Sequence, residues 1–193
     1  MSFTYEGARE PALSGISFSV KRGQTVGIIG GTGSGKSTLV NLIPRFYDVT
    51  EGGVYVDGHD VREYPLDQLR GKTGVVPQKA VLFHGTLREN MQWGKKHASD
   101  GEIYEALKTA QAFEFVEEKD EGLELYIQAG GKNLSGGQRQ RLTIARALVR
   151  KPEILIMDDS ASALDFATDA RLRKAMKERT QDMTVFILSL IHI

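Results

Sequence analysis

Gly30-Gly-Thr-Gly-Ser-Gly-Lys-Ser37 is the stretch that decides the fold. It matches the pattern G-x-x-x-x-G-K-[ST] in full, in which glycines let backbone N–H groups turn inward around phosphate oxygens. The β-branched run Thr25–Ile29 before it predicts a strand, and the pattern turns helical from Lys36 to about Phe46. Strand, glycine loop and helix in this order predict a phosphate-binding loop, with Lys36 reaching the β and γ phosphates and Ser37 offering a hydroxyl to Mg²⁺.

An acidic strand end accompanies this loop. Ile154–Met157 is a fully apolar run of strand length that ends in Asp158, and Thr184–Ser189 reads as another buried strand. Ligands of open α/β sheets bind at the carboxyl ends of the strands. We therefore expect Asp158 to hold the Mg²⁺ shell, either through water or through Ser37. The alternative is an aspartate that only caps the following turn.

Composition narrows the class further. The 193 residues include 25 Lys+Arg, 25 Asp+Glu and no cysteine, which indicates a single globular domain without a disulfide framework or a Cys-ligated metal. Because the positive and negative charges balance, the chain lacks the excess of Lys and Arg that is typical of nucleic-acid-binding proteins. The longest uncharged apolar run, Thr184–Ile193, is about half of the roughly 20 residues of a membrane helix. We expect no membrane span, and Met1–Glu6 lacks the features of a secretory signal.

The remaining elements alternate in type along the chain. Val54–Asp57 before Gly58 predicts one arm of a hairpin, and Thr73–Val76 predicts a strand that Pro77 ends. Further helices are predicted over Leu66–Arg70, Thr86 to about Glu118, Gly136–Arg150 and, with an aspartate cap, Asp165–Thr180. These patterns predict an α/β core from residues 1–77 and 151–193, with a helical part inserted over residues 78–150.

Leu134-Ser-Gly-Gly-Gln138, followed by an amphipathic stretch, resembles the signature of ATP-binding cassette (ABC) ATPases. Ser135 and two glycines at a helix N-terminus offer a second set of exposed N–H groups that could bind an anion, here called an anion cradle, in addition to the phosphate loop. One nucleotide does not need two such cradles from one chain. In that family the signature completes the site of a second cassette, and two head-to-tail cassettes enclose two ATP molecules. The resemblance implies a P-loop NTPase core, a RecA-like mixed sheet with an antiparallel β portion, and an inserted helical subdomain.

The resemblance also implies a role for each matching position. ATP and Mg²⁺ are the implied ligands; Lys36, Gln78 and Asp159 are the implied catalytic groups, and Ser37, Gln78 and Asp158 the groups around the metal. Implied nucleotide contacts are Tyr5, Gly30, Gly31, Thr32, Gly33, Ser34, Gly35, Lys36, Ser37, Thr38, Leu134, Ser135, Gly136, Gly137, Gln138 and Asp165. Tyr5 matches the ring that stacks on adenine, and Ser162–Asp165 the loop that touches the partner cassette. Edge-strand packing for Tyr5 and simple helix caps for Ser135 and Asp165 are the structural alternatives.

Pro77–Phe83, followed by Thr86–Asn90, is similar to the exporter branch of the family, whose cassettes are fused behind six membrane helices. This similarity implies ATP-driven export at the cytoplasmic face of the cell membrane, with membrane-spanning helices fused upstream or in a partner. A strict monomer is expected to be a weak ATPase because half of each site is missing. Two other functions stay open: a soluble, non-transport ABC ATPase, and an ATP-binding module that acts as a dimerisation latch.

Three positions depart from the family pattern. Asp159 replaces the glutamate that orients the attacking water, and its carboxylate is withdrawn by about 1.5 Å. Slow hydrolysis is therefore expected, as in the Asp-substituted subunit of heterodimeric multidrug and lipid exporters; a tolerated base in a working homodimer is the alternative. Ala129 replaces a glutamate that faces the membrane domains in many exporters. Leu190 occupies the switch position, where leucine cannot hydrogen-bond, and His192 receives no function.

The end of the chain is unusual for the family. Back-translated, Leu188–Ile193 is compatible with a transposon-end adaptor. The expectation from this tail is a reading frame cut short. Whether the native chain starts at Met1 or ends at Ile193 stays open.

Overall fold

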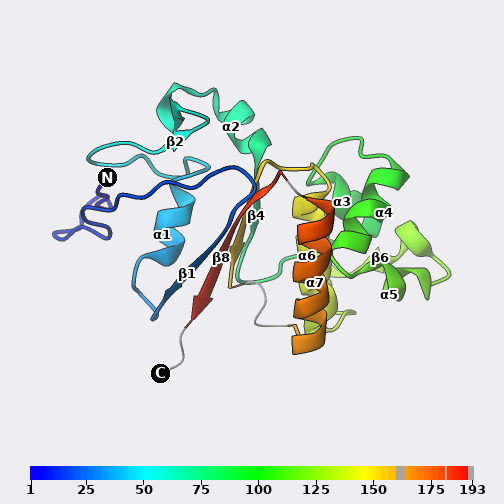
Figure 1. Ribbon diagram of the computed structural model, residues 1–193. Coiled ribbons are helices and arrows are strands. Elements are labelled where there is room, and N and C mark those ends of the chain that lie inside the picture. Colours follow the sequence, from blue (N-terminus) through cyan, green and yellow to red (C-terminus); the bar gives the residue numbers. More distant parts are fainter. Residues whose placement is uncertain (160–163, 181, 191–193) are drawn as a thin grey trace.

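A four-stranded parallel sheet forms the centre of the computed structural model, which describes residues 1–159, 164–180 and 182–190 (Figure 1). The strands are, in spatial order, β1 (Thr25–Gly30), β8 (Thr184–Leu190), β7 (Ile154–Asp158) and β4 (Thr73–Val76). Every pairing in this sheet is parallel. The carboxyl ends of all four strands therefore meet at one edge, the carboxyl edge, where the loops after β1, β4 and β7 begin.

Side chains of the two central strands alternate between two apolar cores. Leu155 and Val185 pack into the core of the helical layer, whereas Ile156 and Phe186 pack on the opposite face. α1 (Lys36–Asn41) covers this second face, and α6 (Gly136–Leu148) and α7 (Phe166–Arg179) cover the first (Figure 1). Both central strands pack against an apolar core on each side, which accounts for the apolar runs Ile154–Met157 and Val185–Leu188 within them.

The segment between β4 and β7 is helical. It contains α3 (Leu87–Gln92), α4 (Asp100–Thr109), α5 (Phe113–Glu117) and α6, with the short pair β5 (Gly85–Thr86) and β6 (Tyr126–Ile127). Capping boxes at Thr86 and Ser99 begin α3 and α4. Leu107 and Leu142 are fully buried where α4 meets α6, so these helices form one packed unit against the sheet.

Antiparallel pairing is confined to short ladders outside the four-stranded sheet. The hairpin of β2 (Tyr55–Val56) and β3 (His59–Asp60) turns at Asp57 and Gly58, whose φ angles of 50° and 81° suit a two-residue turn. Isolated bridges join Ser2 to Glu51 and Phe3 to Leu13. α2 (Leu66–Lys72) then leads into β4. The antiparallel portion expected from the sequence thus forms, but as separate ladders.

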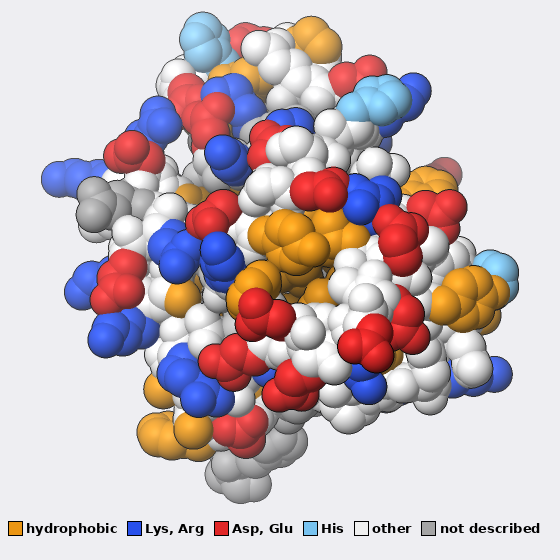
Figure 2. All heavy atoms as spheres, turned by 90° about the vertical axis from the view of Figure 1, so that its right-hand side faces the viewer, with side chains coloured by type: hydrophobic (Ala, Val, Ile, Leu, Met, Phe, Trp, Pro, Cys, Tyr) orange, Lys and Arg blue, Asp and Glu red, His pale blue; other side chains and the backbone are white. Residues whose placement is uncertain are grey.

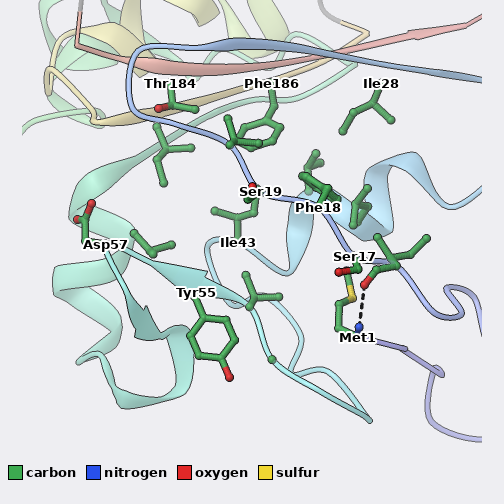
Figure 3. Close-up of a pocket in the computed structure, with 18 of the residues that line it drawn as sticks. Met1, Ser17, Phe18, Ser19, Ile28, Ile43, Tyr55, Asp57, Thr184 and Phe186 are labelled. Carbon is green, nitrogen blue, oxygen red and sulfur yellow. Dashed lines mark hydrogen bonds between the residues drawn. The ribbon is translucent and has the colours of Figure 1, made fainter.

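An apolar cavity of about 480 Å³ lies between α1, the central sheet and the segment that contains β2 (Figure 3). Phe18, Ile28, Ile43 and Phe186 are among the side chains that line it, and α1 itself contributes Leu39 and Val40. None of the residues that line the cavity belongs to the glycine loop Gly30–Ser37. The cavity is therefore separate from the predicted phosphate site.

Most predicted elements are confirmed to within two residues. The helical stretch from Thr86 to Glu118 is divided into α3, α4 and α5, and one predicted helix is wrong in its length. The helix expected to reach Phe46 ends at Asn41. Pro44 lacks the N–H that another helical turn would use, and Arg45 adopts a left-handed φ of 55°. Together these residues turn the chain away after little more than one and a half turns of helix.

Candidate nucleotide-binding site

The loop after β1 closes around its own lysine. Lys36 Nζ donates hydrogen bonds to the carbonyl oxygens of Gly30, at 2.7 Å, and Gly31, at 2.8 Å. Ser34 Oγ donates to the Gly31 oxygen at 2.9 Å. The ammonium group thus lies inside the phosphate loop (Gly30–Ser37), where a polyanion could replace these carbonyl contacts.

Glycine is required at the end of this loop. Gly33 and Gly35 have φ angles of 80° and 85°, which L side chains rarely adopt. A β-carbon at Gly35 would lie 2.9 Å from the Leu13 side chain. Gly35 is also the N-cap of α1 and, having no side chain, supplies no acceptor to the N–H groups of the first turn. These N–H groups and Lys36 fit the phosphate groups of a nucleotide.

The acidic residues lie at the same carboxyl edge. Asp158 ends β7 with a half-buried side chain, and Asp159 follows with a left-handed φ of 46°. Gln78 Nε2 donates to Asp159 Oδ2 at 3.3 Å, which joins the loop after β4 to the loop after β7. A strained backbone at such a position is typical of functional sites. The structure therefore brings Gln78, Asp158 and Asp159 to the edge that carries the phosphate loop.

The donor set at this edge suits magnesium that arrives with a nucleotide. Within residues 1–159, 164–180 and 182–190, no three His, Cys, Asp or Glu side chains group as a metal site. Mg²⁺ commonly binds one or two protein groups together with water and substrate phosphates. Ser37 and Asp158 are the protein groups that would hold it here, and a bound Mg²⁺ would neutralise phosphate charge.

Tyr5 lies against α1 rather than on an isolated strand edge. Its hydroxyl and the Thr38 Oγ1 are 2.9 Å apart, in a hydrogen bond that ties the ring to α1. The Tyr5 ring also meets Phe3 and Tyr47 edge-on, with centroids 4.7 and 5.3 Å away. Tyr47 was missed by sequence reasoning because no local pattern marks a contact between segments so far apart.

The signature segment (Leu134–Gln138) begins α6 in another layer of the molecule. Ser135 Oγ accepts from the Gln138 N–H at 3.2 Å, and Gln138 Oε1 accepts from the Ser135 N–H at 2.9 Å. Ser135 and Gly136 are exposed to solvent, Gly137 is partly so, and Leu134 packs on the helical core. Because α1 and α6 cover opposite faces of the sheet (Figure 1), the two anion cradles of this chain belong to different layers.

Asp165 is the N-cap of α7. Its carboxylate accepts from the Thr168 N–H at 2.9 Å and from the Thr168 hydroxyl at 2.7 Å. The hydroxyl bond, followed by the backbone bond, lowers the pKa of Asp165 below its ordinary value. The aspartate cap predicted for this helix is therefore present. Ser162 and His192 lie outside the described residues.

The position expected for the switch residue lies beside the phosphate loop. Leu190 pairs with Gly30 in the parallel ladder of β1 and β8. Position 190 therefore lies at the carboxyl edge of the sheet, next to the start of the phosphate loop. Ala129, the other departure, begins a short 3-10 turn that precedes the signature segment.

The family profile described as ABC transporter matches residues 13–162. These residues include the phosphate loop, Gln78, the signature segment and both aspartates at the end of β7. The chain belongs to the ABC transporter family. Its core has the family's P-loop NTPase fold, an α/β arrangement of parallel sheet, antiparallel strands and helical insert.

Relatives of this ABC domain are much longer proteins. An uncharacterised ABC transporter ATP-binding protein of Mycobacterium tuberculosis is 47% identical over 191 residues, covering 97% of this chain and 32% of the relative. The ATP-dependent lipid A-core flippase of Vibrio cholerae is 43% identical over 194 residues, or 98% of this chain and 33% of the flippase. The domain therefore spans about a third of the curated relatives that it matches.

The solved structures include a similar fold with nucleotide. A bacterial Atm1-family ABC exporter with ATP bound superposes with a TM-score of 0.91 at 37% identity, over 97% of this chain and 33% of the exporter. In the part of this ABC domain that the structure describes, no helix is both long and apolar enough to cross a membrane.

The helical face of the domain carries charges of both signs. Figure 2 shows basic and acidic side chains interspersed around a small apolar patch. Arg88 forms ion pairs with Asp100 and Glu124, and Lys95 forms one with Glu102. These ion pairs link α3 and the loop after it to α4 and to the turn that contains Glu124, so the charges of these five side chains are matched within the chain.

Proposed function

We propose that this chain is the nucleotide-binding domain of an ABC exporter. It binds Mg·ATP and pairs head-to-tail with a second cassette to power transport across a membrane. The observation that carries the proposal is the phosphate loop itself, in which Lys36 lies among inward carbonyl groups and the first turn of α1 has no side-chain cap. The names of its relatives, a flippase and an Atm1-family exporter, support the transport part.

The need for a second cassette follows from the separation of the two cradles. The exposed Ser135 and Gly136 begin α6, which lies across the sheet from α1 and the phosphate loop. A helix N-terminus with exposed glycine N–H groups favours an anion. We infer that the signature segment, together with the loop that ends at Asp165, contacts the nucleotide bound to the phosphate loop of the partner cassette.

Hydrolysis at this chain's own loop is proposed to be slow. Asp159 is the proposed general base, and Gln78, which donates to it at 3.3 Å, is the proposed link to the metal and γ-phosphate. General-base catalysis contributes typically about 10²–10⁴-fold, and the short side chain of Asp159 withdraws its carboxylate from the attacking water. This supports a heterodimer in which the partner has the faster site. It also supports a second candidate function, an ATP-held dimerisation latch.

An exposed aromatic pair supports a contact with membrane-spanning helices. Trp93 is 70% and Phe83 43% exposed, and their ring centroids are 5.0 Å apart. Arg146 stacks on Phe83, and the buried Asn90 holds the Phe83 backbone with two hydrogen bonds. A rigid apolar pair of this kind is typical of interaction surfaces. We propose that residues 78–150 form a helical subdomain and that residues 1–77 and 151–193 form the ATP-binding core. In this proposal the aromatic pair, which lies on the helical subdomain, faces membrane helices at the cytoplasmic face of the cell membrane.

Complementation between two inactive variants tests the composite site. Lys36→Ala disables the phosphate loop, and Ser135→Arg fills the signature cradle with a cation. Homodimers of either variant contain no intact site, whereas a mixed dimer combines one intact phosphate loop with one intact signature. We expect ATP-dependent dimers, measured by light scattering, from the mixture and from neither variant alone.

The alternatives predict other results. If each chain binds and acts on ATP alone, the Ser135→Arg variant keeps full activity and mixing adds nothing. If the chain is only a dimerisation latch, the mixture dimerises with ATP but releases no phosphate above the level of the Lys36→Ala chain.

A further inference from the structure

Three aromatic rings pack together beside α1, two of them edge-on to the third, Tyr5. Phe3 and Tyr5 come from the N-terminal segment, and Tyr47 follows α1 in sequence. The centroids of Phe3 and Tyr47 lie 4.7 and 5.3 Å from that of Tyr5, with interplanar angles of 80° and 84°. Near-perpendicular pairs at these distances are favourable beyond the area that they bury. Tyr5 is therefore held by two neighbouring rings.

The two neighbours of Tyr5 differ in their surroundings. Phe3 is 4% exposed and belongs to the core around Leu42. Tyr47 is 43% exposed, and Tyr5 itself is 38% exposed. Phe3 is thus part of the packing beneath Tyr5, whereas Tyr47 contacts Tyr5 near the surface, where a ligand can reach both rings.

The hydroxyl of Tyr5 supplies the third constraint. Its 2.9 Å hydrogen bond to Thr38 Oγ1 reaches α1 two residues beyond Lys36. Thr38 is buried, so this anchor is fixed by the packing of α1. One end of the Tyr5 ring is therefore tied to the helix that begins at the phosphate loop, and Tyr47 fixes the plane of the ring.

We propose that Tyr47 is a positioning residue for the nucleotide base: it holds the plane of Tyr5 so that the exposed part of that ring meets a purine. This inference rests on the proposed function, in which Tyr5 stacks on the base of ATP. Aromatic stacking on a base depends on ring orientation, and an edge-on aromatic pair is worth enough to set it. The ring of Tyr47 contacts those of Tyr5 and Phe3, so its proposed effect on the base is exerted through Tyr5.

Affinity for ATP, compared with affinity for inorganic tripolyphosphate, separates base binding from phosphate binding. We expect Tyr47→Leu to weaken ATP binding about three- to tenfold and to leave tripolyphosphate binding unchanged. Tyr47→Phe keeps the ring and should bind both ligands like the unaltered chain. Tyr55→Leu removes another exposed tyrosine, on β2, and should change neither affinity. If Tyr47→Leu does not fold, Tyr47→Met asks the same question, because methionine has similar bulk and no ring.

A double-mutant cycle tests whether Tyr47 acts through Tyr5. In a Tyr5→Leu background, Tyr47→Leu should weaken ATP binding no further, because the ring that it positions is gone. An unchanged ratio of ATP to tripolyphosphate affinity in Tyr47→Leu, or full additivity of the two changes, overturns the inference while leaving the proposed function intact. Failure of the unaltered chain to bind either ligand overturns both.

Discussion

Lengthening one carboxylate is expected to accelerate the proposed hydrolysis of ATP by this chain. In the structure, Gln78 Nε2 and Asp159 Oδ2 are 3.3 Å apart, beyond the usual 2.9–3.0 Å or so of a strong N–H···O bond. Asp159→Glu extends the side chain by about 1.5 Å, toward the space where a water would attack. If the aspartate forfeits part of a general-base contribution of about 10²–10⁴-fold, the variant should recover roughly 10–100-fold in kcat.

The assay is steady-state phosphate release at saturating Mg·ATP, with the chain at a concentration at which ATP produces dimers. Asp158→Glu is the matched control, because it makes the same change one residue earlier. That change displaces a proposed metal ligand and should lower the rate. An unchanged or lower rate in Asp159→Glu, with ATP affinity intact, would refute the argument that the short side chain limits hydrolysis.

Three further predictions concern stability. Gly35→Ala places a β-carbon 2.9 Å from a leucine side chain, at a residue whose φ is 85°. This variant should lower the free energy of unfolding, measured in urea, by about 1–2 kcal/mol. The control Gly101→Ala, in open space on α4, should be neutral or stabilising. Asn90→Ala, at a side chain that is 1% exposed, leaves the Phe83 N–H unpaired and should cost about 2–3 kcal/mol in the same assay. Asp165→Ala should lower Tm at pH 7 by a few degrees. Because the pKa of Asp165 is depressed in the folded chain, this difference in Tm should be fully present above the ordinary aspartate pKa of about 4. It should vanish as the pH falls through the pKa of the folded state.

Strands with strong local patterns were predictable from the sequence. Ile154–Met157 and Val185–Leu188 are apolar without interruption, and both lie in central strands that pack against an apolar core on each face. The phosphate loop was equally clear, because its glycines and Lys36 lie in one continuous segment. The length of α1 was misjudged, although Pro44 carried the signal that ends it.

Contacts between distant segments could not be predicted from local patterns. The hydrogen bond from Gln78 to Asp159 joins two loops that only the order of the strands brings together. The ring contact between Tyr5 and Tyr47 likewise depends on how the N-terminal segment folds over α1. Family resemblance indicated roles for Gln78 and Tyr5 but not the partners that hold them.

Binding of Mg·ATP to the chain, measured by isothermal titration calorimetry, tests the central claim most directly. The structure predicts saturable binding with one nucleotide per chain. Lys36→Ala, which removes the ammonium group inside the phosphate loop, should weaken binding at least about tenfold. Lys132→Ala, at an exposed lysine outside the loop, should bind like the unaltered chain. Absence of saturable binding, or equal binding by the Lys36→Ala variant, would contradict the assignment of this chain as an ATP-binding cassette.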